Sequence, residues 1–132
     1  MDAQSVVDLL SQKFHIRSSH FRCLADKNAT RDAIIDGFQD HLIENNNIEH
    51  GDIIIIYYAG HGSRTTAPNG WDADDNKVET ICPHDERTRD CNGDEIFGIP
   101  DRTISGLLRK LYKFKGDKIV RMTCHSLHLF LI

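Results

Sequence analysis

The sequence lacks the features of a disulfide-stabilised or membrane-spanning protein. It has four cysteines in 132 residues, but they form no Cys-x-x-Cys pair and no secretory signal precedes them. This pattern argues against a disulfide framework and against a zinc knuckle. The apolar segment at 127–132 is far too short to cross a bilayer. We therefore expect a soluble intracellular protein with reduced cysteines, no membrane partner and the cytoplasm as its default location.

The sequence also lacks a strong charge of either sign. Its 16 lysines and arginines stand against 20 acidic residues, which gives a net charge of -4, and the basic residues form no run. Nucleic-acid-binding domains usually carry a basic stripe or patch, so we expect no nucleic-acid partner. The length suits one domain with a real core, and we expect that domain to span residues 1–132.

Apolar spacing predicts alternating helices and strands. Apolar residues between positions 34 and 42 recur at helical spacing behind Thr30, a residue type that favours a helix N-cap. The run at 53–58 is apolar without alternation, which predicts a central strand buried on both faces. The patterns predict helices at 2–14, 30–44 and from Asp101 to about 111, strands at 21–24, 53–58, 78–82 and 118–123, and a polar loop at 63–76. This alternation predicts an α/β protein with a parallel sheet.

Two chemically reactive residues follow the ends of predicted strands. His61 lies between two glycines just beyond the strand at 53–58, and Cys124 directly follows the strand at 118–123. Reactive groups of an open parallel sheet gather beyond the carboxyl ends of its strands, so we expect both side chains in one crevice. A neighbouring imidazole activates a thiol for nucleophilic attack, and Gly62 leaves an amide free to donate to an oxyanion. The pattern predicts a Cys/His nucleophilic site.

Simpler interpretations exist for these residues, and other site motifs are incomplete. A lone histidine after a strand is usually a surface residue, and a lone buried cysteine is usually inert. The glycines at 60–62 start like a dinucleotide fingerprint but lack the third glycine. The acidic turn at 72–76 opens like an EF-hand loop, but Lys77 replaces the required glycine. Cys82, His84 and Cys91 are too cramped for zinc and lack a fourth ligand, so the residues predict no metal site.

Four segments carry a family resemblance. They are Tyr57-Tyr-Ala-Gly-His-Gly-Ser63, Ile81-Cys-Pro-His-Asp85, Ile99-Pro-Asp101 and Cys124-His-Ser126. In this order they resemble the histidine motif, the I-x-P-x-D segment, the "IPD" helix start and the end of the nucleophile motif of caspase-like cysteine peptidases. The similarity is greatest to metacaspases, two shorter matches fit the fungal pattern, and the resemblance extends over about residues 2–126.

The resemblance implies a fold and a set of residue roles. It implies a three-layer α/β/α fold with a mainly parallel central sheet, of which this chain holds the large-subunit region. It implies that His61 is the general base or proton partner and Cys124 the nucleophile, with the amides of Gly62 and Cys124 as the oxyanion hole. It further implies cleavage of peptide or protein substrates after Arg or Lys, with Asp85 and Cys82 lining the substrate pocket. From the residues alone, Asp85 is equally a turn or cap residue. No cofactor is required for the chemistry, and calcium is a possible activator with unknown ligands.

The chain also departs from the family pattern. Met122 stands where the family has an aspartate two residues before the nucleophile, and Leu127 replaces a glycine. The first and last strands of the family sheet are expected to be missing, so we expect a domain truncated at both ends with weak or no peptidase activity. Exposed sheet edges favour self-association. A non-catalytic remnant that binds a homologue or another partner protein is therefore the alternative to the peptidase.

Overall fold

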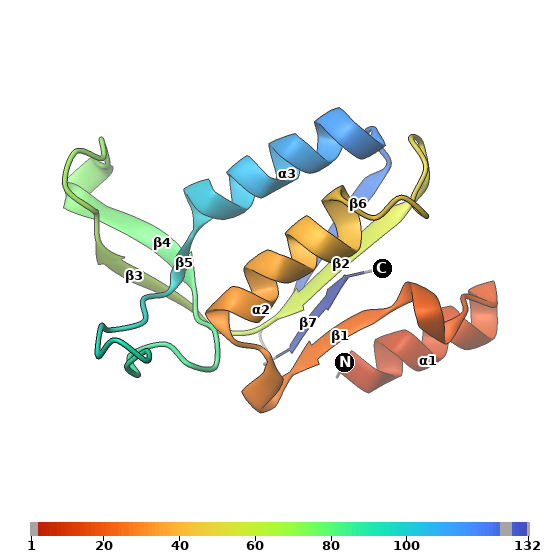
Figure 1. The fold of residues 1–132 in the computed structure, drawn as a ribbon, viewed down its shortest axis with the longest axis horizontal. Coiled ribbons are helices and arrows are strands. Elements are labelled where there is room, and N and C mark those ends of the chain that lie inside the picture. The colour runs from red at the N-terminus through yellow and green to blue at the C-terminus, as the bar shows by residue number, and fades with distance from the viewer. Residues whose placement is uncertain (1–2, 125–127, 132) are drawn as a thin grey trace.

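A four-stranded sheet forms the centre of the structure (Figure 1). The computed structural model describes the main chain of residues 3–124 and 128–131 and the side chains of residues 4–123. The sheet order is β1-β7-β2-β6. Its strands are β1 (Arg22–Ala25), β2 (Ile54–Ala59), β6 (Ile119–Cys124) and β7 (His128–Leu131). The helices are α1 (Ala3–Phe14), α2 (Arg31–Asp36), the π-helical η3 (Gly37–Ile43) and α3 (Asp101–Lys115), with short 3-10 turns η1 (Ser18–His20), η2 (Asp26–Asn28) and η4 (Asp74–Asn76).

The sheet is mixed because of β7. Strands β2 and β6 are parallel, whereas β7 is antiparallel to both of its neighbours, β1 and β2. Three of the four strands, β1, β2 and β6, therefore run in one direction, as predicted for a mainly parallel sheet. The apolar segment at 127–132 was not expected to form an element, but residues 128–131 occupy the position between β1 and β2. Four residues without a turn signal or a long apolar pattern are too few to predict a strand from sequence.

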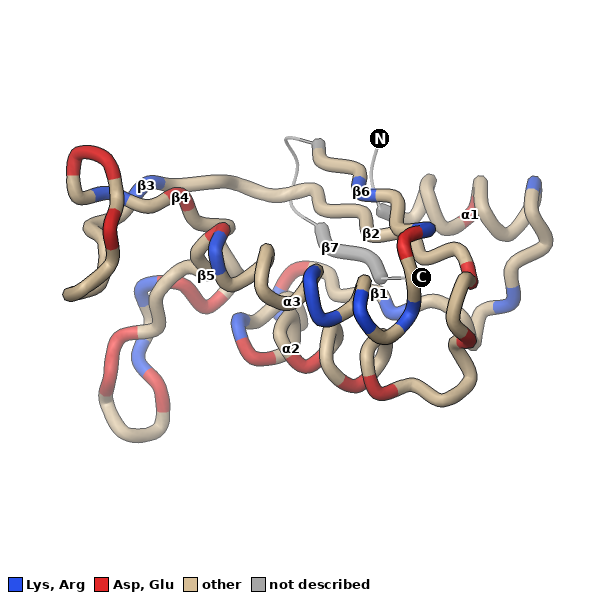
Figure 2. Tube along the Cα trace, turned by 90° about the horizontal axis from the view of Figure 1, so that it is seen from above, with Lys and Arg blue, Asp and Glu red and all other residues tan. Residues whose placement is uncertain are grey.

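Strand β2 explains the layering. Its alternate residues Ile54 and Ile56 belong to a buried cluster with α2, η3 and α3, whereas Tyr57 and Ala59 belong to a second cluster with α1. Figure 2 shows α1 on one side of the sheet and α2 and α3 on the other. From residue 54 onward the run is therefore covered on both faces, as its composition predicts, whereas Ile53 is exposed and lies outside β2. The α/β class is confirmed.

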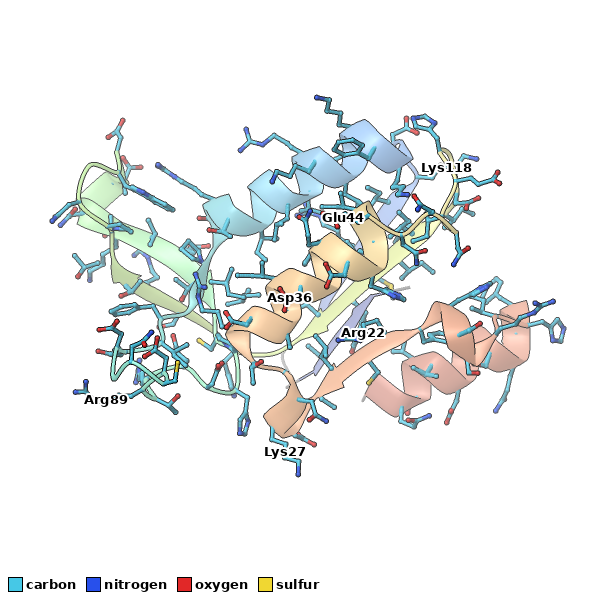
Figure 3. The ribbon with its side chains drawn as sticks, in the orientation of Figure 1. Arg22, Lys27, Asp36, Glu44, Arg89 and Lys118 are labelled. Atoms are coloured by element: carbon cyan, nitrogen blue, oxygen red, sulfur yellow. The ribbon has the colours of Figure 1, made fainter. Side chains whose placement is uncertain are left out.

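The larger cluster holds most of the core. Its fully buried side chains come from α2, η3, β2, β5 (Ile99–Pro100) and α3; they are Ile34, Phe38, Leu42, Ile54, Ile99 and Leu111. Full burial of one such side chain contributes about 1.5–3 kcal/mol. Figure 3 shows the opposite behaviour for charged side chains such as Lys27, Arg89 and Lys118, which extend away from the ribbon.

The helix starts agree closely with the sequence. Thr30 is the N-cap of α2, and its hydroxyl oxygen accepts a hydrogen bond from the amide of Ala33 at 3.3 Å. Asp101 was predicted to cap the third helix, but Pro100 is the N-cap and Asp101 is the first helical residue. The Asp101 carboxylate accepts from the amide of Arg102 at 2.7 Å, so it still binds an N-terminal amide of α3.

A second sheet corrects the prediction of a loop at 63–76. Strands β3 (Gly62–Thr66), β4 (Lys77–Ile81) and β5 form a three-stranded antiparallel sheet. Strand β3 is mostly exposed and has no apolar face, so its sequence lacks the alternation that indicates a strand. The predicted strand at 78–82 is confirmed as β4. The short segment between β2 and β3 connects the central sheet to this small sheet, as Figure 1 shows.

Candidate active site

Two predicted site residues lie at, or just beyond, the carboxyl ends of two neighbouring strands of the central sheet. In the parallel pair of β2 and β6, Ala59 is in register with Cys124. His61 follows Ala59 by two residues, in the turn that leads into β3. Main-chain register therefore puts His61 and Cys124 at the same edge of the sheet. The side chain of Cys124 and residues 125–127 lie outside the described part of the chain.

The turn that carries His61 is fixed by two hydrogen bonds to one carbonyl. The main-chain oxygen of His61 accepts from the Tyr58 hydroxyl at 2.9 Å and from the amide of Cys82 at 3.0 Å. The side chain of His61 is exposed, so a ligand can reach the imidazole. Gly60 fits closely against Tyr58, because a Cβ at position 60 would overlap the Tyr58 hydroxyl and two of its ring carbons, the farthest at 2.9 Å.

The amide of Gly62 faces away from strand β4. Gly62 is in register with Ile81, and the Cys82 amide donates to the His61 carbonyl on the flanking position. This arrangement makes Gly62 and Ile81 a non-hydrogen-bonded pair of an antiparallel ladder. The β3–β4 ladder therefore does not use the Gly62 amide.

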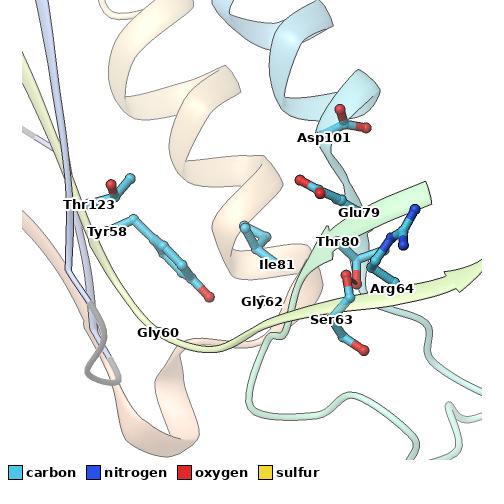
Figure 4. A pocket seen from close by; sticks show the side chains of 10 residues that line it. All are labelled: Tyr58, Gly60, Gly62, Ser63, Arg64, Glu79, Thr80, Ile81, Asp101 and Thr123. Atoms are coloured by element: carbon cyan, nitrogen blue, oxygen red, sulfur yellow. Dashed lines mark hydrogen bonds between the residues drawn. The ribbon is translucent and has the colours of Figure 1, made fainter.

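A surface pocket of about 630 Å³ opens beside this edge. Its lining comes from the ends of β2 and β6, from β3 and β4, and from the start of α3 (Figure 4). The charged residues of the lining are Glu79, Asp101 and Arg64. Arg64 forms an ion pair with Asp75 at 3.2 Å, which offsets part of its positive charge. The pocket therefore has two carboxylates and a partly neutralised guanidinium, together with the polar groups of Tyr58 and Thr123.

Asp85 connects the segment after β4 to the start of α2. Its carboxylate oxygen accepts from the amide of Arg31 at 2.8 Å, at the first residue of α2. The amide of His84 donates to the carbonyl of Ala29 at 2.8 Å, so the two contacts form one junction. Asp85 does not line the pocket described above. Its observed contact is that of a cap residue, which is the simpler of the two interpretations from sequence.

Cys82 binds the His61 turn through its amide, and its thiol interacts with Glu86 and Tyr58. Burial, together with a hydrogen bond to Glu86 and its negative charge, raises the pKa of the Cys82 thiol to about 11. Burial, with a smaller contribution from Cys82, raises the pKa of Tyr58 to about 12. Both groups therefore remain protonated at neutral pH. Cys82 has the properties of a structural thiol and not of an activated nucleophile.

The described residues include no site of three or more histidine, cysteine, aspartate or glutamate side chains that is arranged to hold a metal ion. Cys91, one of the three residues considered for zinc, is exposed and free. In the acidic turn at 72–76, Asp75 instead pairs with Arg64. The same part of the chain contains no helix of the length and apolarity needed to cross a bilayer.

Three residues of the site were not assigned from sequence. Glu79 and Asp101 contribute the carboxylates of the pocket, and the Tyr58 hydroxyl binds the His61 turn. Asp101 drew attention only as the start of a helix. Glu79 is one of the exposed positions of β4, and an outward-facing charge on a strand is too common to indicate a site.

The fold and this edge define a class of protein: an α/β protein with a histidine and a cysteine at the ends of adjacent parallel strands, beside a pocket. The chain matches the family model described as "Metacaspase, peptidase C14 domain" over residues 1–130. It therefore belongs to the metacaspase family and is, by family, a caspase-like cysteine peptidase that acts on proteins or peptides. No curated protein and no solved structure gave a match to this chain.

Proposed function

We propose that the chain is a cysteine endopeptidase in which His61 and Cys124 form the catalytic dyad. The observation that carries this proposal is the parallel register of Ala59 with Cys124, because it brings the histidine turn and the cysteine to one edge. In the reaction the imidazole accepts the thiol proton, and the sulfur attacks the carbonyl carbon of the scissile peptide bond. The protonated imidazole then donates to the leaving amine, and water hydrolyses the thioester.

The amides of Gly62 and Cys124 are the proposed oxyanion hole. The direction of the Gly62 amide, away from β4, supports its role as one donor. Two preorganised amides stabilise the negative charge that develops on the substrate oxygen in the transition state.

We further propose cleavage after Arg or Lys. Support comes from Glu79 and Asp101, whose carboxylates line the pocket and attract a basic side chain. Because Met122 replaces the aspartate expected near the nucleophile, these two residues supply the negative charge. Asp85 and Cys82 remain proposed substrate-pocket residues by resemblance only, and their observed contacts are with Arg31 and Glu86.

A covalent probe tests the dyad and the specificity together. The purified chain is incubated with an arginyl peptide that carries an electrophilic ketone, with and without calcium, and modified peptides are mapped by mass spectrometry. We expect labelling at Cys124, at least tenfold slower labelling in His61→Ala, and no labelling by the matched aspartyl probe. Equal rates in the two proteins would contradict the dyad. Calcium activation, proposed by resemblance, predicts faster labelling when calcium is present.

We expect weak turnover of arginyl peptide substrates by this chain. Robust turnover of a fluorogenic arginyl peptide that Cys124→Ala abolishes would contradict that expectation and leave the dyad intact. Calcium is again included and omitted in parallel samples.

Binding of a second copy through β6 is the alternative function. Among the described strands, β6 pairs with β2 alone, and its side chains Val120 and Met122 are 47% and 40% exposed. An unpaired edge with apolar side chains is a template for β-strand addition. We expect concentration-dependent sedimentation that Val120→Lys abolishes, whereas a monomer at all concentrations would exclude this function for the isolated chain.

A further inference from the structure

We propose that Tyr58 is a positioning residue, whose hydroxyl orients both His61 and the Gly62 amide through one peptide group. This inference rests on the proposed dyad, since it assigns a role to Tyr58 in the chemistry of that site. It is carried by the hydrogen bonds around the turn at 58–62 and by the close packing of Tyr58 on Gly60.

The central contact is the hydrogen bond from the Tyr58 hydroxyl to the His61 carbonyl at 2.9 Å. The amide of Cys82, the residue directly after β4, donates to the same carbonyl at 3.0 Å. The carbonyl therefore has one donor from the strand before the turn and one from the residue that follows β4. Two donors from separate elements define its direction more closely than either alone.

The His61 carbonyl and the Gly62 amide belong to one planar peptide group. In a trans peptide the N–H points opposite to the C=O, so the direction of one determines that of the other. All peptide bonds in the described chain are trans. When Tyr58 and Cys82 hold the carbonyl, they also aim the Gly62 amide away from β4. Tyr58 thus acts on the proposed general base and on the proposed oxyanion donor at once.

The sequence around Tyr58 is adapted to this contact. Its side chain folds back over Gly60, where a Cβ would overlap the hydroxyl and ring. Tyr58 also packs against the larger core cluster, which restricts movement of its ring. Figure 4 shows the hydroxyl end of Tyr58 directed toward the segment at 60–62. Tyrosine, glycine and histidine at 58, 60 and 61 therefore form one structural unit.

The hydroxyl remains a donor across the working pH range. Burial is the main reason that the pKa of Tyr58 rises to about 12. The proton needed for the bond to His61 is therefore retained at neutral pH. The neighbouring Cys82 thiol, whose pKa is also raised, adds no negative charge there.

Tyr58→Phe tests the proposal because it keeps the ring and removes only the donor. The matched control is Tyr112→Phe, at an exposed tyrosine of α3 that is far along the chain from the turn. The first readout is nuclear magnetic resonance of the Gly62 amide and the His61 imidazole, which does not depend on activity. We expect both signals to shift and broaden in Tyr58→Phe, with signals of the buried Leu10 in the second cluster unchanged, and no effect in the control.

The second readout is the rate at which the arginyl probe modifies Cys124. We expect Tyr58→Phe to lower the maximal labelling rate about tenfold at an unchanged half-saturating probe concentration, because only positioning is lost. Unchanged Gly62 and His61 signals would overturn the proposal. Altered signals with an unchanged labelling rate would also overturn it, since the orientation would then have no chemical effect. If the wild-type chain is not labelled at all, the dyad fails, and the resonance measurement still decides whether Tyr58 orients the turn.

Discussion

The turn before His61 gives the most detailed stability prediction. Gly60→Ala places a methyl group where the Tyr58 hydroxyl and ring already lie. The backbone of Gly60 does not have a positive φ, so alanine causes no backbone strain and the cost comes from the overlap. To relieve it, Tyr58 must rotate away from the core and lose its hydrogen bond to the His61 carbonyl. One lost hydrogen bond and an overpacked contact together cost about 2 kcal/mol.

Urea denaturation of purified variants measures this cost. Gly62→Ala is the matched control, because the nearest atom to its Cβ is the Thr80 carbonyl oxygen at an ordinary 3.5 Å. We expect the control to change the free energy of unfolding by less than about 0.5 kcal/mol.

A double-mutant cycle identifies the cause. In a Tyr58→Ala background the ring is absent, and Gly60→Ala should cost less than about 0.5 kcal/mol. If Gly60→Ala destabilises both backgrounds equally, the overlap with Tyr58 is not the reason for the glycine. A cost below about 0.5 kcal/mol in the wild-type background would likewise show that Tyr58 tolerates a methyl group at position 60.

Three further predictions concern other described contacts. Lys115 is 8% exposed and donates to the carbonyls of two residues in the 45–48 segment at 2.7 and 2.8 Å. Lys115→Met should therefore lower the free energy of unfolding by about 3 kcal/mol, against little change for the exposed Lys113→Met, and equal effects would contradict this role. Asp85→Asn should cost about 1 kcal/mol in urea denaturation through weaker capping at Arg31, and unchanged stability would leave substrate binding as its role. Folding raises the pKa of Cys82 from 9.0 to about 11, so its contribution to the free energy of unfolding is full below pH 9 and is lost as the pH rises toward 11. Alkylation of Cys82 by iodoacetamide should therefore increase between pH 9 and 11. Complete alkylation at pH 8 would contradict the raised pKa.

The main architecture could be predicted because its signals are local and strong. The run at 53–58 has a β-branched and aromatic composition that favours a strand buried on both faces, and residues 54–58 lie in β2. The helix that starts behind Thr30 and the helix that starts near Asp101 have apolar residues at helical spacing and recognisable starts. The shared position of His61 and Cys124 could also be predicted, because parallel strands have their carboxyl ends on the same side of a sheet.

The rest depends on contacts between distant residues. Strand β3 forms because its backbone pairs with β4, and its exposed side chains carry no matching pattern. Strand β7 forms by pairing with β1 and β2, which no short apolar segment specifies by itself. The contact of Asp85 with Arg31 joins residues 54 positions apart, so sequence left cap and substrate roles open. The sequence placed Tyr58 in a strand and in the histidine motif but gave its hydroxyl no role, because that hydroxyl meets the His61 carbonyl only through the shape of the turn.

The proposed dyad requires positions 61 and 124 to lie close together, and thiol crosslinking measures that proximity. A His61→Cys variant is treated with dibromobimane, which joins only closely spaced thiols, and crosslinked peptides are mapped by mass spectrometry. Arg64→Cys with Glu79→Cys is the positive control, because these residues are cross-strand neighbours, and Ser105→Cys on the exposed side of α3 is the negative control. We expect a crosslink between Cys124 and the new cysteine at 61, and none between Cys124 and the cysteine at 105. A crosslinked positive control without the 61–124 product would contradict the shared edge and the peptidase dyad with it.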